Sequence, residues 1–433
     1  MRRFKRYPAY KDSGVEWLGE VPAHWETRKL KFVSTVIMGQ SPPSEHYNTS
    51  GDGLPFLQGN ADFGIEHPVP RIFCPVAPKT VKAGDHLISV RAPVGALNTA
   101  DQAYGIGRGL CAVRIRPPLT DNRFARWSLR VSLRGLDTVA VGSTYEAVST
   151  EDVSGLTVPL PQTQEQRAIA AFLDRETVKI DAMVAKKERL IDLLKEKRAS
   201  LITQAVTKGL DPKVPMKDSG VEWIGETPAH WEVQRIKWVA RMESGHTPDK
   251  KVASYWQGGD IPWVSLADTG QLREVDYIAD TAVMTTLDGI AHSSAHILPA
   301  GTVVFSRDAT IGLCAITRTE MAVSQHFIGW VCGIRLRPEY LLFVLRSMTQ
   351  ELEHLTMGAT VRTIGMPDVK SLSTPVPPVL EQEEIVHYIR KHRDRVDSLT
   401  AKIHTAIDRL KELRTALISA AVTGKIDVLE EAD

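Results

Sequence analysis

Two long segments of the chain, residues 158–211 and 374–427, carry apolar residues separated by gaps of three, four or their sums. This spacing on a charged background is typical of a coiled-coil seam. About 45 residues at 1.5 Å each make a helix of roughly 65–70 Å. The seam residues are Ile169, Leu173, Ile180, Met183, Leu190, Leu194 and Leu201 in the first segment, and Ile385, Ile389, Val396, Leu399, Ile403, Leu410, Leu413 and Leu417 in the second.

Local signals place the ends of these helices. Thr163 is a suitable N-cap, and Gln166 three residues later predicts a capping box. Gly209 and Gly424 follow the last seam residues, where glycine commonly ends a helix. Two such helices in one chain are predicted to pack antiparallel, with a globular domain at either end of the pair.

The chain is also an internal duplication. Residues 11–33 (KDSGVEWLGEVPAHWETRKLKFV) match residues 217–239 (KDSGVEWIGETPAHWEVQRIKWV) without a gap, with 16 of 23 positions identical. The long segments repeat as well, so that Glu165-Gln166 matches Glu381-Gln382. A repeat can be a simple stability array, but arrays are similar throughout and usually need three copies. Constant ends with divergent middles instead indicate one frame that carries two different readers.

The divergent middles have a mixed α/β pattern. Short β-like runs such as residues 84–95 and 301–312 alternate with turn residues, and residues 123–136 and 339–355 have the spacing of amphipathic helices. We therefore predict an α/β (α+β) fold with a pseudo-two-fold repeat. The expected boundaries are a first domain at 1–160, a central helix at 161–210, a second domain at 211–376 and a C-terminal helix at 377–433.

Composition excludes several classes of protein. The net charge is only +1, so charge alone gives no support for nucleic-acid binding. No apolar run is long enough to span a bilayer, and the basic N-terminus has no apolar segment behind it. The four scattered cysteines have no metal or redox spacing, which predicts reduced thiols in the cytoplasm. No phosphate-binding loop, metal site or Asn/Asp-Pro-Pro-aromatic string is present, so catalysis by this chain is not expected.

The repeated strings resemble a known family. SGVEWLGEVPAHW and PLPQTQEQRAIAAFLD, with their second copies SGVEWIGETPAHW and PPVLEQEEIVHYI, resemble the specificity (S) subunits of type I restriction–modification systems. The resemblance covers nearly the whole chain and includes the order of variable and conserved regions.

The resemblance implies a non-catalytic, sequence-specific DNA-binding subunit for host defence. Each middle would be a target recognition domain that reads one half of a split, asymmetric site in double-stranded DNA. The helices would set the spacer and dock two modification (methyltransferase) subunits, which would bind S-adenosylmethionine and methylate adenine. Restriction (translocase–nuclease) subunits would bring ATP and Mg, so no cofactor or metal is expected on this chain.

Base reading requires polar side chains on loops held by a rigid body, and loops that recur in both copies are the best candidates. We match Arg91 with Arg307. The stretch 104–108, which ends at Arg108, is matched with the stretch 324–326, which ends at Gln325-His326. The loop after Gly142 is matched with the loop after Gly358. The DNA-binding candidates are therefore Arg91, Arg108, Ser143, Thr144, Tyr145, Arg307, Gln325, His326, Thr360, Arg362 and Thr363.

The repeated tryptophans and the Glu-Gln pairs are candidates for contact with the partner subunits, although structural packing is the favoured explanation of the tryptophans. These residues are Trp17, Trp25, Trp223, Trp231, Glu165, Gln166, Glu381 and Gln382. Two other functions stay open: a specificity subunit of a methylation-only or other defence complex, and a coiled-coil adaptor that binds proteins.

Overall fold

The computed structural model describes residues 4–133, 148–357 and 362–429. The chain divides into two compact units. The first consists of Met1–Lys187 with Thr405–Asp433, and the second of Glu188–His404. Each unit contains one globular domain and parts of both long helices, α5 (Thr163–Lys208) and α12 (Val379–Val422).

The first unit has two four-stranded sheets, ordered β6-β5-β10-β7 and β4-β11-β8-β9, and two strand pairs, β1-β2 and β12-β3. Neighbouring strands are antiparallel except β5 and β10. The strands are β1 (Tyr10–Asp12), β2 (Glu20–Pro22), β3 (Glu26–Lys29), β4 (Ser34–Met38), β5 (Leu54–Leu57), β6 (Ile72–Cys74), β7 (Thr80–Val81), β8 (His86–Ser89), β9 (Leu97–Thr99), β10 (Tyr104–Ile106), β11 (Leu110–Ile115) and β12 (Thr157–Leu160). The shorter helices are α1 (Leu30–Val33), α2 (Asn122–Ser132) and α4 (Thr150–Gly155).

The second unit repeats this plan with additions. Its sheets are ordered β16-β23-β20-β21-β18 and β19-β17-β22, with the pairs β13-β14, β15-β26 and β24-β25. The strands are β13 (Met216–Asp218), β14 (Glu226–Pro228), β15 (Glu232–Arg235), β16 (Ala240–Ser244), β17 (Ile261–Val264), β18 (Tyr277–Ile278), β19 (Met284–Thr285), β20 (Val303–Ser306), β21 (Cys314–Thr317), β22 (Ala322–Val323), β23 (Phe327–Cys332), β24 (Thr356–Met357), β25 (Thr363–Ile364) and β26 (Ser373–Val376). The shorter helices are α6 (Ile236–Val239), α7 (Thr269–Glu274), α8 (Leu287–Ala291), α9 (Pro338–Ser347), α10 (Thr349–His354) and α11 (Met366–Ser371).

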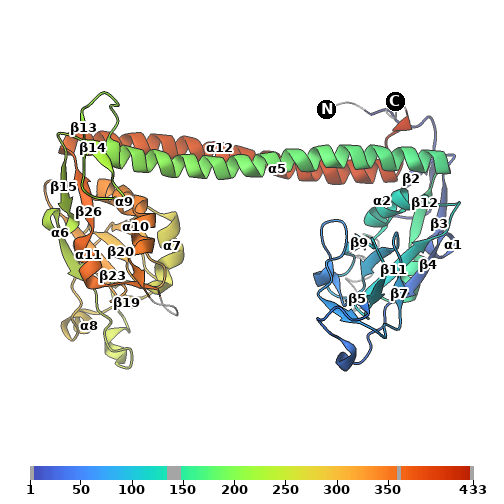
Figure 1. Cartoon of the computed structure of the whole chain (residues 1–433), viewed down its shortest axis with the longest axis horizontal. Helices are drawn as coiled ribbons and strands as arrows, with labels where there is room; N and C mark the ends of the chain where they lie inside the picture. Colours follow the sequence, from blue (N-terminus) through green and yellow to red (C-terminus); the bar gives the residue numbers. More distant parts are fainter. Residues whose placement is uncertain (1–3, 134–147, 358–361, 430–433) are drawn as a thin grey trace. The chain divides into compact units, whose positions relative to one another are not determined.

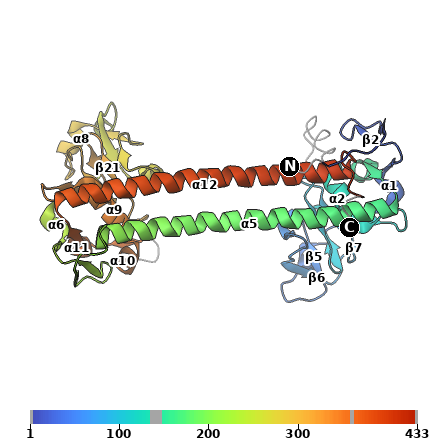
Figure 2. The same ribbon diagram turned by 90° about the horizontal axis from the view of Figure 1, so that it is seen from above.

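The long helices run antiparallel within each unit, as the seam predicts. In the first unit the beginning of α5 packs beside the end of α12 (Figures 1 and 2). Ile169, Leu173 and Leu417 belong to one hydrophobic core there. Arg414 also donates to Asp181 at 2.8 Å. In the second unit the end of α5 lies beside the beginning of α12, and Arg198 donates to Asp397 at 2.9 Å. The predicted fold class is confirmed.

Two local predictions are wrong. Thr163 and Gln166 do not form a capping box: the Thr163 hydroxyl donates to the carbonyl of Pro118, and the Gln166 amide bonds elsewhere. The stretch 339–355 is not one helix, because α9 ends at Ser347 and α10 restarts at Thr349. Met348, between the two helices, has φ of −82° and ψ of 15°, and its side chain is fully buried.

No helix in the described ranges is long and apolar enough to cross a membrane. The four cysteines are free thiols, and Cys74, Cys111 and Cys314 are buried. Burial raises the pKa of the Cys111 thiol to about 12 and that of Cys314 to about 11. These thiols are therefore protonated and packed as small apolar side chains.

Candidate nucleic-acid interface

A tight turn of the same construction follows β8 in the first unit and β20 in the second. In the first turn the Ser89 hydroxyl donates to the carbonyl of Pro93 at 2.7 Å and accepts from the amide of Ala96 at 2.9 Å. In the second, Ser306 bonds in the same way to Thr310 and to Leu313. Each turn ends in a glycine with φ of 85°, Gly95 or Gly312, a conformation that glycine adopts without a steric penalty.

This shared frame corrects one match made from the sequence. Val90 donates its amide to Gly109 as Arg307 donates its amide to His326, so Arg307 is equivalent to Val90. The residue equivalent to Arg91 is therefore Asp308. Aligning the two arginines, Arg91 and Arg307, therefore shifts one turn against the other by one residue. The two turns present an arginine in one unit and an aspartate in the other.

Arg91 and Arg108 lie together in the first unit. Both line a cleft of about 600 Å³, with Tyr47 and Gln58 among the other lining residues. Both arginines are exposed, and the Arg108 backbone amide donates to the Ser41 hydroxyl at 3.1 Å. Among the described residues neither arginine has an ion-pair partner, so both can take an anionic or carbonyl acceptor from outside.

In the second unit the predicted residues gather around Asp308. His326 Nδ1 lies 2.8 Å from Asp308 Oδ2, and the Thr363 hydroxyl donates to Oδ1. Gln325 lies beside the His326 ring, at 3.3 Å between their Nε2 atoms. Three stretches that are far apart in sequence, at Arg307, Gln325-His326 and Arg362-Thr363, therefore meet at one place.

Backbone hydrogen bonds hold this meeting point. Ala309 donates to the carbonyl of Arg362 at 2.8 Å, and Ile364 donates to that of Arg307 at 2.9 Å. Ala309 has φ of 60°, which is unusual for a residue with a Cβ atom. Arg362 and Gln325 remain exposed. The candidates Ser143, Thr144, Tyr145 and Thr360 lie outside the described residues.

The predicted partner-binding residues have clear places inside their own units. Glu165, at the start of α5, accepts from the Tyr7 hydroxyl at 2.6 Å and from Trp25 Nε1 at 2.9 Å, and His24 lies 3.0 Å away. Glu381 accepts from Trp231 Nε1 at 2.7 Å in the same way, with His230 at 2.8 Å. The rings of Trp25 and Trp231 are buried, whereas Trp17 and Trp223 are half-buried.

The glutamines after these glutamates are fully buried and have three hydrogen bonds each. Gln166 accepts from the amide of Asp121 and donates to the carbonyls of Leu119 and Pro161 at 2.8–3.0 Å. Gln382 makes the same three bonds to Arg337, Arg335 and Pro377, each at 2.8 Å. We call this arrangement the glutamine latch. Any partner contact at these positions would meet their exposed neighbours and not the buried amides.

Tyr7 belongs to the glutamate cluster of the first unit alone. Burial, and then the hydrogen bond to Glu165, raises the pKa of the Tyr7 phenol far above its usual value. The phenol therefore keeps its proton and donates it to Glu165. Lys213 stands at the position of Tyr7 in the repeat.

Two exposed aromatic residues were missed from the sequence. Phe32 on α1 is 56% exposed, and Trp238 on α6, its equivalent in the repeat, is 66% exposed. Large aromatic side chains exposed at the same place in two near-copies indicate a contact surface and not a core. The matching strings KLKFV and RIKWV contain a signal for this surface. Both have an aromatic residue at the same position, phenylalanine in the first and tryptophan in the second.

Within the described part of the chain, no group of three or more His, Cys, Asp or Glu side chains could hold a metal ion. The candidate interface therefore offers hydrogen-bond donors and cations on loops, and its described residues offer no assembled metal centre.

Comparison with known proteins gives one consistent picture. A family model for the type I restriction modification DNA specificity domain matches residues 22–191 and 228–409. The putative type I restriction enzyme MjaX specificity subunit of Methanocaldococcus jannaschii is 38% identical over 188 residues, 43% of this chain and 44% of that protein. The chain thus spans less than half the length of this relative. The EcoBI specificity subunit of Escherichia coli is 20% identical over 96% of this chain and 89% of its own.

Two solved structures share the fold. A chain from a structure of the assembly and conformational transition of a type I R-M system has a TM-score of 0.69, with 18% identity over 93% of this chain and 98% of its own. The HsdS subunit of Thermoanaerobacter tengcongensis has a TM-score of 0.57, with 17% identity over 96% and 100%. At this identity the likeness shows the fold.

Proposed function

The chain belongs to the family of type I restriction–modification DNA specificity subunits, and from this we propose that each globular domain reads one half of a bipartite DNA site. The subunit recognises DNA and leaves catalysis to other subunits. The observation that carries the proposal is the duplicated turn, which holds Arg91 in one unit and Asp308 in the other on the same backbone frame. A DNA site whose two halves differ in sequence requires two domains that present different polar groups, and the shared backbone frame carries such a difference.

The chemistry of the first unit suits a guanine edge or a phosphate. An arginine donates two parallel hydrogen bonds to guanine O6 and N7, or to phosphate oxygens. Arg91 and Arg108 line the same cleft, without described ion-pair partners. They supply the paired donors of the first half-site.

The second unit reads with a different set of groups. Asp308 is occupied by His326 and Thr363, so it orients these residues and is not itself free to accept from a base. Arg362 and Gln325 are the exposed donors beside it, and Arg307 is mostly covered, with 22% of its side chain exposed. Gln side chains suit an adenine edge and Arg side chains suit guanine.

The long helices would set the number of unread base pairs and dock two methyltransferase subunits. Rigid protein geometry sets half-site spacing in other DNA-binding proteins, and an uninterrupted helix is such a spacer. Exposed Phe32 and Trp238, with half-buried Trp17 and Trp223, recur in both copies. One kind of partner could therefore bind twice. S-adenosylmethionine, ATP and Mg would bind to the methyltransferase and restriction subunits.

The test is to express the chain with a type I methyltransferase subunit from its own host and to map methylated adenines across a genome. A split motif is expected. The double variant Arg91→Ala/Arg108→Ala should relax or abolish the first half of the motif and leave the second half and the gap unchanged. Removal of matched helical turns from α5 and α12 should change the gap alone. Methylation without a split motif, or loss of both halves together in the double variant, would contradict the proposal.

A further inference from the structure

The start of α5 and the start of α12 hold their globular domains by the same glutamine latch. The latch uses one buried amide and three backbone groups, so it does not distinguish the two domains. On the latch alone, either domain would fit either helix. A second set of contacts lies about two helical turns further along each long helix. In these contacts the charges of the helix residue and of its partner in the domain are reversed between the two units.

The repeat defines which positions correspond. Asp174 lies eight residues after Gln166, and Arg390 lies eight residues after Gln382. Arg123 lies two residues after Asp121, and Glu339 lies two residues after Arg337, the residues whose amides the latch binds. An arginine of the domain facing an aspartate of the helix in the first unit thus becomes a glutamate facing an arginine in the second.

The contact of the first unit centres on Asp174. Its carboxylate accepts from Arg123 Nε at 2.9 Å, Arg126 Nη2 at 3.2 Å and Trp127 Nε1 at 2.8 Å. All three donors are on α2 of the globular domain. The helix therefore supplies the anion and the domain supplies two cations.

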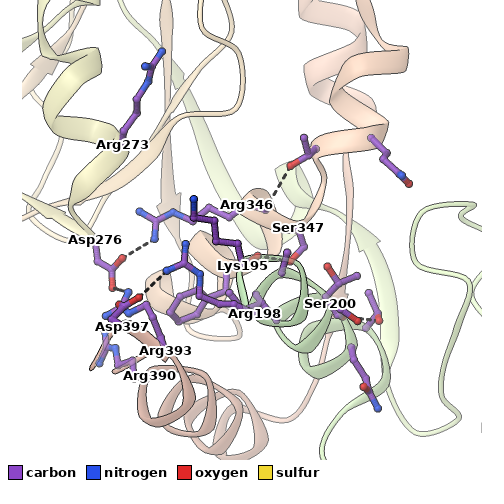
Figure 3. A pocket seen from close by; sticks show the side chains of 18 of the residues that line it. Lys195, Arg198, Ser200, Arg273, Asp276, Arg346, Ser347, Arg390, Arg393 and Asp397 are labelled. Atoms are coloured by element: carbon purple, nitrogen blue, oxygen red, sulfur yellow. Dashed lines mark hydrogen bonds and ion pairs between the residues drawn. The ribbon is translucent and has the colours of Figure 1, made fainter. Parts of the chain in front are cut away.

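The second unit reverses the arrangement. Arg390 Nη2 donates to the Tyr277 hydroxyl at 2.8 Å, and this hydroxyl donates to Glu339 at 2.7 Å. One turn along α12, Arg393 donates to Asp276 at 2.5 Å, and Asp276 also accepts from Arg346 at 2.6 Å (Figure 3). Here the helix supplies two cations and the domain supplies the anions.

Asp276 is held firmly as an anion. Burial alone would raise the pKa of this carboxyl, but the hydrogen bonds from Arg393 and Arg346 outweigh burial and lower it. Asp276 lies on the wall of a cavity of about 1600 Å³ between the second globular domain and the two helices of its unit. Figure 3 shows Arg390, Arg393 and Arg346 beside it.

We propose that this charge-reversed contact makes docking exclusive, so that each globular domain fits only its own helix start. If the first domain sat on α12, Arg123 and Arg126 would face Arg390 and Arg393. If the second domain sat on α5, Glu339 would face Asp174, and Asp276 would face Thr177, the residue equivalent to Arg393. Like charges at a partly buried contact oppose docking, and the wrong pairing also leaves charges without partners.

The proposal concerns docking and does not depend on DNA reading. The contact is made by four positioning residues, which determine which domain docks on which helix: Arg123, Asp174, Glu339 and Arg390. The two helix starts share the Glu-Gln pair and one isoleucine, Ile169 or Ile385, so these shared residues cannot distinguish the two domains.

The first experiment exchanges a domain in the full chain. Residues 240–371 are replaced by residues 34–155, which places Arg123 opposite Arg390. Amide hydrogen exchange is measured in the segment 382–393 of α12, whose sequence remains unique. Exchange is expected to be roughly tenfold or more faster than in the native chain. The further changes Arg390→Asp and Arg393→Thr, which copy the residues of α5, should restore protection.

Point variants cover the case in which the exchanged chain does not fold. Asp174→Arg should speed exchange at the start of α5 by roughly tenfold. The set Arg123→Glu/Arg126→Leu/Trp127→Phe/Asp174→Arg copies the second unit and should recover most of the protection. Arg28→Glu, which faces Glu26 on β3, is the matched control and should leave the start of α5 unchanged.

Recovery by the copied set separates an electrostatic match from general damage, since four changes would otherwise harm the fold more than one. The proposal is overturned if the exchanged domain protects α12 fully without Arg390→Asp and Arg393→Thr. It is also overturned if the copied set is no better protected than Asp174→Arg alone.

Discussion

The two units agree where the globular domain meets the first turn of its helix, and they differ at the loops and at the next helical turns. Gln166 and Gln382 make the same three hydrogen bonds. Arg91 and Asp308, in contrast, occupy one position with opposite charge, as do Asp174 and Arg390. The two copies therefore keep the polar contacts at the helix starts, including those of Glu165 and Glu381, and they differ in charge at the turns and further along the helices.

The largest expected effect is on the shared latch. Gln166→Leu would leave two carbonyls and one amide without partners in a buried site, and each such loss costs about 1–3 kcal/mol. We expect the free energy of unfolding of the first unit to fall by roughly 3–5 kcal/mol, measured by chemical denaturation with hydrogen exchange to assign the unit.

Gln382→Leu should cause a loss of similar size in the second unit, because its hydrogen bonds are the same. Gln164→Leu, at an exposed position on the same helix turn, is the control and should be nearly neutral. A small effect of Gln166→Leu, equal to that of the control, would show that the latch does not stabilise the domain.

The second prediction concerns a buried histidine that one unit alone contains. His86 on β8 bonds to the carbonyl of Asn122 and to the Thr99 hydroxyl, and Val303 replaces it in the second unit. The pKa of His86 is lowered from 6.5 to about 4, chiefly by burial and also by the nearby Arg126, while Asn122 and Asp85 act in the opposite direction. The folded state thus holds the neutral ring.

Because the unfolded chain binds the proton more readily, this contribution to stability is complete above pH 6.5 and is lost as the pH falls towards 4. The loss is expected to be roughly 3 kcal/mol. Hydrogen exchange between pH 7 and 4, corrected for intrinsic rates, should show the first unit weakening more than the second. His86→Val should reduce the difference, whereas exposed His67→Val should not. Equal acid sensitivity of the two units would contradict this assignment.

The third prediction separates the two readers. Arg91→Ala should weaken specific DNA binding of the assembled complex by about tenfold, because one bidentate contact is worth about 1–3 kcal/mol. Binding is measured at a constant salt concentration, since phosphate contacts are strongly salt-dependent. Arg28→Ala on β3 serves as the control for loss of a cation. An unchanged affinity and an unchanged salt slope in Arg91→Ala would remove this residue from the interface.

The smallest effect on stability is expected at the exposed aromatic pair. Phe32→Ala and Trp238→Ala should each change the free energy of unfolding by less than about 0.5 kcal/mol, because both rings are largely in solvent. If they form the partner surface, each variant should weaken binding of a methyltransferase subunit, measured by titration. The half-buried Trp223→Ala should cost more stability, which makes it a useful comparison. Full partner affinity in the double variant would exclude this surface.

The sequence by itself determined the features that are local or copied. The apolar spacing predicted both long helices, and the constant strings predicted the duplicated frame, because a seam and a repeat are visible along the chain. Gly209 and Gly424 at the helix ends have φ of 74° and 68°, as expected of glycines that end helices. The sequence selected Arg307, His326 and Thr363 as candidates from loops that recur in both copies, but it did not predict that these residues meet.

Tertiary structure decided the partners of the polar side chains. Gln166 looked like half of a capping box, but its amide is used by Leu119 and Asp121, which are more than 40 residues away. Arg123 and Asp174 are 51 residues apart, so no local pattern could pair them. The one-residue shift that places Asp308 opposite Arg91 follows from backbone hydrogen bonds. A charge in a sequence has many possible partners, and only the folded chain selects among them.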